Sequence, residues 1–189
     1  TTKAAMLSHE STIDACCGAN GEKKQSTYLF IPSDADELDE FVSLQNRISG
    51  QKYTLDDEGV IISEKLATLL DVSEGDDIYL EVSSLNYKPV KVMHIAENYY
   101  YHYVYMTPNV YKETFGEDPD YADIVFAVRD EYKDQTESIG QKIMESPAVL
   151  SISYTASTMD MVNRMLSTLG IVIIVLIVSA GMKSEAKRS

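Results

Sequence analysis

The sequence predicts an α+β domain that is joined to a membrane-spanning helix. Three observations lead to this prediction. Short runs typical of strands alternate with amphipathic runs typical of helices, 44% of the 189 residues are hydrophobic, and one late segment of seventeen residues has no charged side chain. This length suits one domain with a sizeable insertion, and the apolar fraction is sufficient for a packed core.

The first half of the chain is expected to alternate strands and helices. Pro32 ends the first strand, and acidic side chains at the start of the next run favour a helix because they complement the helix dipole. Ser63 is a residue type that caps helices, so a helix is expected directly after the second strand. The predicted strands are 26–31 and 59–63. The first predicted helix is 34–44, whose apolar face carries Leu38, Phe41, Val42 and Leu44. The second follows Ser63, and its apolar face carries Leu66, Leu69 and Leu70.

The second half continues the same alternation. Gly75 and the two aspartates after it form a turn signal, and Pro108 suits the first turn of a helix. The predicted elements are an antiparallel pair of strands at 78–82 and 90–95, a strand at 103–106, a helix from Pro108 to Phe115, a buried strand at 124–128, a helix at 137–144 and a last strand at 149–154.

Charge and cysteine content exclude several classes of protein. Lys and Arg number 16 against 30 Asp and Glu, which gives a formal net charge of -14. Such an acidic chain repels phosphate backbones, so nucleic-acid binding is excluded first. Two cysteines are too few for a disulfide scaffold or a cysteine-based zinc site.

The uncharged segment 166–182 is interpreted as a membrane span. A spanning helix needs about 20 apolar residues, with a range of roughly 17 to 25. A buried strand or core helix is the alternative, because Ile171–Val178 is also a strong strand-forming run, but the length favours a span. No proline interrupts the run that starts at Thr158, so a stalk and span are expected over 158–182, with Met161, Met165 and Leu169 on the stalk.

The charge distribution predicts the orientation of this span. The tail 183–189 carries Lys183, Lys187 and Arg188 and one acid, whereas the preceding body is strongly acidic. By the positive-inside rule, the basic tail is expected in the cytoplasm and residues 1–158 on the extracellular side of the cell membrane. Because the chain begins at Thr1 without a methionine, we expect it to be a fragment whose outer domain is delivered by an earlier span.

No motif predicts catalysis. The fragment Gly18–Lys24 has two residues between its glycines where a phosphate loop needs four, and Gln25 follows the lysine in place of Ser or Thr. An exposed hairpin turn is therefore expected there. No Gly-x-Ser-x-Gly and no His-Glu-x-x-His sequence occurs. The chain is predicted to be no enzyme and to hold no cofactor.

The histidines and cysteines do not predict a metal site. His9, His94 and His102 are far apart in the sequence, and the adjacent Cys16 and Cys17 cannot chelate as a spaced pair. Outside the cell, the two cysteines could form a strained disulfide with each other, pair with another chain or remain reduced. Buried thiols are the simplest interpretation.

A tyrosine cluster at 99–105 is the most unusual local feature. In a strand, Tyr99, Tyr101, Tyr103 and Tyr105 would point one way, and Tyr100 and His102 the other. Tyrosine combines a large contact area with a polar tip, which is typical of a face that contacts a protein or ligand. Half-buried packing in a sheet explains the same pattern nearly as well.

Several of these stretches, taken in order, resemble one family. Gly59–Ala67 followed by Val72–Leu80 resembles a stretch in the extracytoplasmic domains of FtsX-like, MacB-type ABC transporter permeases. Residues 90–95 and 103–108 follow in the same order as in that family. The run from Met159 into the span is similar to the start of the permease's second transmembrane helix. The resemblance covers most of residues 25–182.

This resemblance implies a domain plan. It implies a porter-type α/β module formed by residues 1–47 and 108–157 and a smaller β-rich insertion at 48–107, standing outside the membrane. A stalk and transmembrane helix at 158–182 and a basic cytoplasmic tail at 183–189 would follow. In this family, a separate ATPase subunit hydrolyses ATP in the cytoplasm and thereby moves the outer domain.

The resemblance also implies partners. They are the ATPase subunit, the other permease spans or a second permease copy, membrane lipid, and a peptide, lipoprotein or lipid as cargo, while catalytic residues are not expected in this part. The alternative is a membrane-anchored binding or sensor module without transport activity, which would use the tyrosine face. The sequence leaves the cargo, the oligomeric state and the redox state of Cys16 and Cys17 open.

Overall fold

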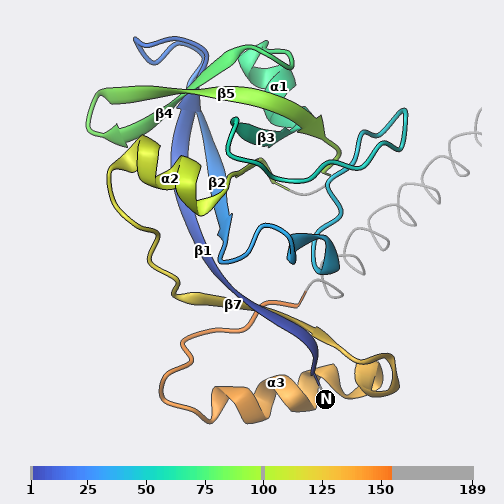
Figure 1. The fold of residues 1–189 in the computed structure, drawn as a ribbon. Helices are drawn as coiled ribbons and strands as arrows, with labels where there is room; N and C mark the ends of the chain where they lie inside the picture. Colours follow the sequence, from blue (N-terminus) through green and yellow to red (C-terminus); the bar gives the residue numbers. More distant parts are fainter. Residues whose placement is uncertain (1, 99–100, 155–189) are drawn as a thin grey trace, which may run out of the picture. The chain divides into compact units, whose positions relative to one another are not determined.

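The computed structural model describes residues 2–98 and 101–154 (Figure 1). The chain divides after Lys133 into two compact units. The strands are β1 (Thr2–Cys16), β2 (Gln25–Pro32), β3 (Val60–Ser63), β4 (Asp77–Ser83), β5 (Asn86–Ala96), β6 (Tyr103–Tyr105) and β7 (Asp123–Val128). The helices are α1 (Glu64–Leu70), α2 (Pro108–Phe115) and α3 (Thr136–Met144), with short 3-10 turns at Leu38–Glu40 and Asp130–Gln135.

Six strands of the first unit close into a small barrel. The sheet order is β2-β6-β3-β5-β4-β1, and β1 also pairs with β2, so the last strand returns to the first. The closing contact with β4 is short, with Ala15 opposite Leu80 and Cys16 opposite Tyr79. A closed barrel of this size is filled by its own side chains, which leaves no room for a channel.

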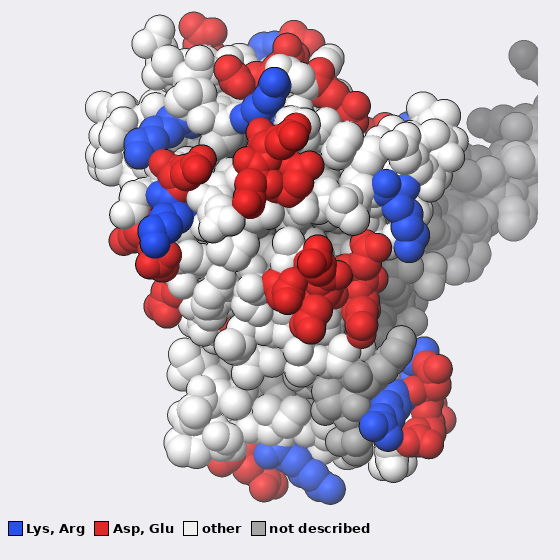
Figure 2. Space-filling view, in the orientation of Figure 1, with Lys and Arg blue, Asp and Glu red and all other residues white. Residues whose placement is uncertain are grey.

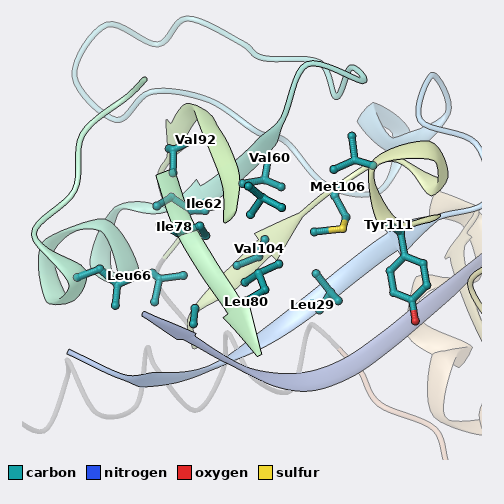
Figure 3. Packing of buried hydrophobic residues seen from close by; sticks show 14 of the residues in the cluster. Leu29, Val60, Ile62, Leu66, Ile78, Leu80, Val92, Val104, Met106 and Tyr111 are labelled. Atoms are coloured by element: carbon teal, nitrogen blue, oxygen red, sulfur yellow. The ribbon is translucent and has the colours of Figure 1, made fainter. Parts of the chain in front are cut away.

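The barrel interior is the main hydrophobic core. Figure 3 shows the side chains of Leu29, Leu80 and Val104 converging between the strands. Helices α1 and α2 add Leu66 and Tyr111 to the same cluster. The fully buried side chains of this core come from nearly every strand of the barrel, and they include Leu29, Ile31, Val60, Ile62, Ile78, Leu80, Val92 and Val104.

A long connection, the strap (residues 33–58), covers part of the outer surface of the barrel. Its Leu38, Leu44, Tyr53 and Leu55 are buried in a second cluster against outward-facing side chains of the strands, among them Phe30, Ile61 and Tyr105. Polar contacts fix the strap: Arg47 forms a two-pronged ion pair with Glu64, and Asp57 accepts hydrogen bonds from Thr107 and Asn109. The strap therefore has a core of its own.

The predicted helix at 34–44 is wrong, because only a single 3-10 turn forms at Leu38–Glu40. The Asp34 carboxylate accepts a hydrogen bond from the Asp36 backbone N–H at 2.9 Å, and this local turn competes with a helix. At the other end, the Leu44 carbonyl oxygen accepts a hydrogen bond from Tyr53 N–H, which joins two parts of the strap. Leu38, Phe41, Val42 and Leu44 still pack into the second hydrophobic cluster, although the segment does not form a helix.

The predicted strand at 124–128 forms as β7, but it is not buried as expected. It pairs only with the first half of β1, so that the two strands form a ribbon (residues 2–8 and 123–128) below the barrel in Figure 1. Ile124 is 64% exposed, and Leu7, directly opposite, is also exposed. A run of apolar residues predicts that a strand forms, but it does not predict whether both faces of that strand are buried.

The remaining predicted elements of the first unit form close to their expected positions. Strands 26–31, 59–63, 78–82, 90–95 and 103–106 correspond to β2 to β6, and the two helices correspond to α1 and α2. β4 and β5 are antiparallel neighbours as predicted. Ser63 stands at the N-cap of α1, but its hydroxyl accepts a hydrogen bond from Tyr103 N–H instead of capping the helix.

In the second unit, α3 confirms the helix expected at 137–144, whereas the strand expected at 149–154 does not form. The ring of Tyr154 lies directly against Gly140 of α3, so close that an added Cβ at Gly140 would be 1.8 Å from the Tyr154 hydroxyl. This segment therefore packs on α3 through a side chain. Among the described residues of this unit, there is no strand with which it could pair.

Some predictions stay untested by this structure. The stalk and span at 158–182, with Met161, Met165 and Leu169, and the tail at 183–189 lie outside the described residues. Within 2–98 and 101–154, no helix has the length and apolar character needed to cross a membrane. The domain boundaries at 48 and 107 also stay a prediction; β3 to β6, which lie between them, pair into the same barrel as β1 and β2.

Candidate partner-binding face

The outward faces of β2 and β6 form a layer of aromatic rings. The two strands run parallel, with Tyr28 opposite Tyr103 and Phe30 opposite Tyr105. The ring centroids of Tyr28 and Tyr103 are 5.3 Å apart and those of Tyr103 and Tyr105 are 5.4 Å apart, both in stacked orientation. The rings thus support one another along the outside of the barrel.

Alternation along the strands separates this layer from the core. Leu29 and Val104 are paired neighbours of these tyrosines, and both point into the barrel, where they are fully buried. The predicted alternation of 103–105 is therefore confirmed by β6, because Tyr103 and Tyr105 share one face. Tyr105 is only 6% exposed and packs under the strap, so it supports Tyr103 from below.

Tyr101 is the most exposed ring of this layer and lies next to Tyr28. It is 51% exposed, and its ring centroid lies 5.0 Å from that of Tyr28 at a tilt of 55°. Its φ of 62° is in the left-handed region, which is unusual for a bulky side chain and stores strain. Tyr99, the fourth residue of the predicted face, lies outside the described residues, and the contact role of all four tyrosines stays a prediction.

Two carboxylates border the aromatic layer. Glu10 of β1 lies opposite Phe30 of β2, on the same face as the tyrosines, and its carboxylate accepts a hydrogen bond from the Tyr103 hydroxyl. Asp123 at the start of β7 accepts a hydrogen bond from the Glu10 backbone N–H at 3.1 Å. In the part of the chain that the structure describes, neither Glu10 nor Asp123 forms an ion pair with a lysine or arginine.

The electrostatics of this arrangement favour neutral forms. Surrounding atoms partly exclude water from the Glu10 carboxyl, and this burial together with the negative charge of Asp123 raises its pKa, although the bond from Tyr103 acts in the opposite direction. Burial and the nearby charge of Glu10 also raise the pKa of Tyr103. The Tyr103 hydroxyl therefore stays protonated and can donate.

Sequence reasoning missed Glu10, Tyr28 and Asp123. Tyr28 alternates with Phe30 in the first predicted strand, and this pattern could have indicated a second aromatic strand. Glu10 lies in β1, a strand that no sequence pattern singled out, and Asp123 comes close to it only through the pairing of β1 with β7. We define these two carboxylates with Tyr28, Tyr101 and Tyr103 as the aromatic–carboxylate face.

The other candidate residues lie in separate places. His94 stacks on Tyr53 of the strap with ring centroids 4.1 Å apart, whereas His9 packs near Tyr111 of α2. Within the described ranges, no three His, Cys, Asp or Glu side chains gather in a way that could hold a metal ion. The predicted buried thiol is confirmed for Cys16, while Cys17 is only partly buried, and both are free.

The burial of Cys16 also affects its chemistry. Its thiol lies 3.2 Å from the Gly18 carbonyl oxygen, to which it donates, and burial raises its pKa. A thiol that stays protonated is a poor nucleophile. Cys16 therefore acts as a small core side chain at the seam where β1 meets β4.

The described part of the first unit is thus a small closed barrel with a strap packed on its outside. No protein-family model matches the chain, and no curated protein matches it. Among solved structures, it is similar to the extracellular domain of the noncanonic ABC-type transporter YknZ from Gram-positive bacteria, with 19% identity and a TM-score of 0.47 over 74% of this chain and 71% of that one.

A second similar structure is the periplasmic region of MacB from Actinobacillus actinomycetemcomitans, with 10% identity and a TM-score of 0.46 over 76% of this chain and 67% of that one. Both solved structures are extracytoplasmic parts of their own proteins. Each likeness is partial and concerns the fold alone.

Proposed function

We propose that this chain is the extracellular domain of an ABC transporter permease subunit, which passes ATP-driven motion across the membrane to export or extract a peptide, lipoprotein or lipid. Residues 158–182 would be the stalk and span, and residues 1–158 would stand outside the cell membrane. The partners would be a separate ATPase subunit and the other permease spans or a second permease copy. The proposal agrees with the class of the YknZ domain, and its support comes from this chain's own residues.

The observation that supports mechanical transmission best is the continuity of β1. This strand of 15 residues pairs with β2 and β4 in the barrel and with β7 in the ribbon. Relative motion of barrel and ribbon would break its ladder of hydrogen bonds, because one uninterrupted strand serves both. Such a stiff connection suits a domain that relays force.

The motif residues have structural roles, as expected for a domain without catalysis. Gly59 precedes β3, and a Cβ there would lie 2.3 Å from the Lys91 carbonyl oxygen, so glycine is required for the close approach of β5. Gly75 adopts a φ of 94° in the turn before β4. These features favour the proposal that the domain is no enzyme, because its most distinctive residues shape the backbone.

A membrane-anchored binding or sensor module without transport activity is the second candidate. The exposed part of the aromatic–carboxylate face favours it, since Tyr101 is half exposed in a strained conformation. The two candidates differ in one respect: only a permease requires an ATPase partner.

Affinity capture of the full-length protein from membranes tests the proposal. We expect a stoichiometric ATPase subunit to be captured. If the full-length protein has a single span and captures no ATPase, the transport proposal is wrong and the sensor module replaces it.

A paired insertion then tests the relay through β1. Two glycines inserted between Met6 and Leu7 would interrupt β1 within the ribbon, just before the strand enters the barrel at Ser8. The same insertion between Ala19 and Asn20 lengthens only the exposed hairpin loop. We expect the first variant to bind the ATPase but to lose transport-linked stimulation of hydrolysis, and the second to retain it. Equal stimulation in both variants would contradict a relay through β1.

A further inference from the structure

The two carboxylates of the aromatic–carboxylate face have no lysine or arginine partner in the described part of the chain, unlike several acids of the barrel. Lys24 bridges Asp14 and Glu81 at 2.8 and 2.6 Å, and Arg47 holds Glu64. Figure 2 shows acidic side chains covering more of the visible face than basic ones. Asp14, Glu81 and Glu64 are thus neutralised by a neighbouring cation, while the described part of the chain provides no lysine or arginine for Glu10 and Asp123.

The lack of a cation leaves two like charges next to each other. Glu10 and Asp123 lie close enough for the charge of Asp123 to disfavour ionisation of Glu10, and neighbouring atoms remove part of the contact of its carboxyl with water. The Glu10 side chain as a whole remains exposed, so a partner can reach it. A positive group placed between the two carboxylates would remove this repulsion. The pair is thus better suited to a bound cation than to an empty surface.

The neighbouring rings add a second means of recognition. Guanidinium and ammonium groups are attracted to the faces of tyrosine rings, and a planar guanidinium can also stack on them. Tyr28 and Tyr101 lie at 55° to each other with centroids 5.0 Å apart, and Tyr103 donates its hydroxyl to Glu10. The strain at Tyr101 is typical of a side chain held in place for contact.

We infer that the aromatic–carboxylate face binds an arginine or lysine side chain of a partner polypeptide. Glu10 and Asp123 pair with the cationic group, and Tyr28, Tyr101 and Tyr103 contact its aliphatic stem and its plane. A polypeptide is the partner of choice because the net charge of -14 repels anionic lipid surfaces and nucleic acids. This inference goes beyond the proposed function and stands whether or not the chain belongs to a transporter.

Peptide binding to the full chain in a zwitterionic detergent tests the inference. The probe is a fluorescein-labelled peptide, Gly-Ser-Arg-Ser-Arg-Ser-Gly, and its matched control carries citrulline, which has nearly the shape of arginine without the charge. Fluorescence anisotropy should give an affinity about tenfold higher for the arginine peptide. Equal affinities for the two peptides would overturn the inference.

Variants of the chain locate the binding. Glu10→Gln keeps the shape of the side chain and should weaken binding of the arginine peptide about tenfold, whereas Tyr101→Gly should weaken it about threefold. Glu113→Gln, an exposed position on α2, removes the same charge elsewhere and should leave the affinity within about twofold. Equal losses for Glu10→Gln and Glu113→Gln would show that binding follows net charge and would overturn the site.

Misfolding would not imitate the expected result. Tyr101→Gly relieves a left-handed backbone conformation, and Glu10→Gln removes a charge repulsion, so both variants should unfold at temperatures equal to or above that of the unaltered chain. A loss of affinity without a loss of stability therefore supports the inference. Failure to capture an ATPase would refute the proposed transport function and leave this result unaffected.

Discussion

The side chains of β2 and β6 that point into the barrel differ in their surroundings from those that point outward. Inward, Leu29 and Val104 are fully buried in the barrel core. Outward, Tyr28 and Tyr103 stack on each other and remain partly open to solvent. One residue of shift along either strand thus changes a side chain from core packing to the candidate contact face.

A small domain can in this way keep its stability and its candidate contact surface on opposite faces of the same strands. Closure of the barrel makes the interior independent of the outer layer, because the strands hold one another in a ring. Strain and like charges are then tolerated outside, as seen at Tyr101 and at Glu10. Substitutions inside the barrel should therefore cost more stability than substitutions on its outer surface.

A cavity in the barrel interior should have the largest effect. Leu80→Ala removes a fully buried side chain from β4, and we expect a loss of about 3 to 5 kcal/mol in the free energy of unfolding. Urea unfolding followed by circular dichroism measures it. Ile48→Ala, in an 86% exposed position of the strap, should change the same free energy by less than about 0.5 kcal/mol; similar losses in both variants would contradict the assignment of the core.

A side chain at Gly59 should disturb the barrel wall. In Gly59→Ala the new Cβ would meet the Lys91 carbonyl oxygen, which is backbone and cannot move aside easily, so we expect a loss of about 1 to 3 kcal/mol. Gly18→Ala is the matched control, since its Cβ would meet only the flexible Glu22 side chain at 3.4 Å. A thermal melt that ranks the two variants in the opposite order would refute the close approach of β3 and β5.

The strap should add a smaller, pH-dependent contribution. Hydrogen bonds from Thr107 and Asn109 lower the pKa of Asp57, so its ionised form stabilises the fold. This contribution is present above the pKa of the unfolded state and is lost as the pH falls through the lower folded-state pKa. Because the site is exposed to solvent, Asp57→Ala should cost less than about 1 kcal/mol of unfolding free energy at neutral pH, and the difference should vanish in acid.

The free energies of unfolding of the unaltered chain and of Asp57→Ala, measured from about pH 2 to about pH 7, test whether their difference decreases in acid. A difference that grows as the solution becomes more acidic would contradict the role of the ionised carboxylate. Asp56→Ala provides a control, because Asp56 is the neighbouring acid and its side chain accepts a hydrogen bond from the Glu58 backbone N–H instead of from Thr107 and Asn109.

The smallest effect is expected at Glu10, with the opposite sign. Its pKa is raised, so the folded state binds a proton more readily than the unfolded chain, and the ionised carboxylate lowers stability at neutral pH. Glu10→Gln should therefore raise the free energy of unfolding by a few tenths of a kcal/mol, roughly. The gain should be present at neutral pH and disappear as the pH falls below the unfolded-state pKa; a stability loss at neutral pH would contradict the proposed repulsion.

The barrel strands β2 to β6 could be predicted from the sequence because they carry local signals, whereas β1 was missed because its sequence carries none. Pro32, Gly75 and Pro108 mark the ends of elements, and the apolar runs between them pair as expected. The failures share a cause: the segments 34–44 and 149–154 have apolar spacing that suits a helix or a strand, but long-range contacts with Tyr53 and with α3 decide their conformations.

The candidate face could be predicted only in part. The run of tyrosines at 101–105 is visible in the sequence, and the alternation of Tyr103 and Tyr105 follows from strand geometry. Glu10 and Asp123 are 113 residues apart, and only the pairing of β1 with β7 brings them together. No local pattern contains that information, which is why the carboxylates and their lack of a cation were absent from the sequence prediction.

The most direct test compares two neighbours on β6, Tyr103→Ala and Val104→Ala, which face opposite sides of the barrel. For each variant, the free energy of unfolding and the affinity for the arginine peptide are measured together. We predict that Val104→Ala loses stability but binds the peptide normally, and that Tyr103→Ala loses affinity by about tenfold. If affinity falls in both variants in proportion to stability, the two faces are not separate and the account is wrong.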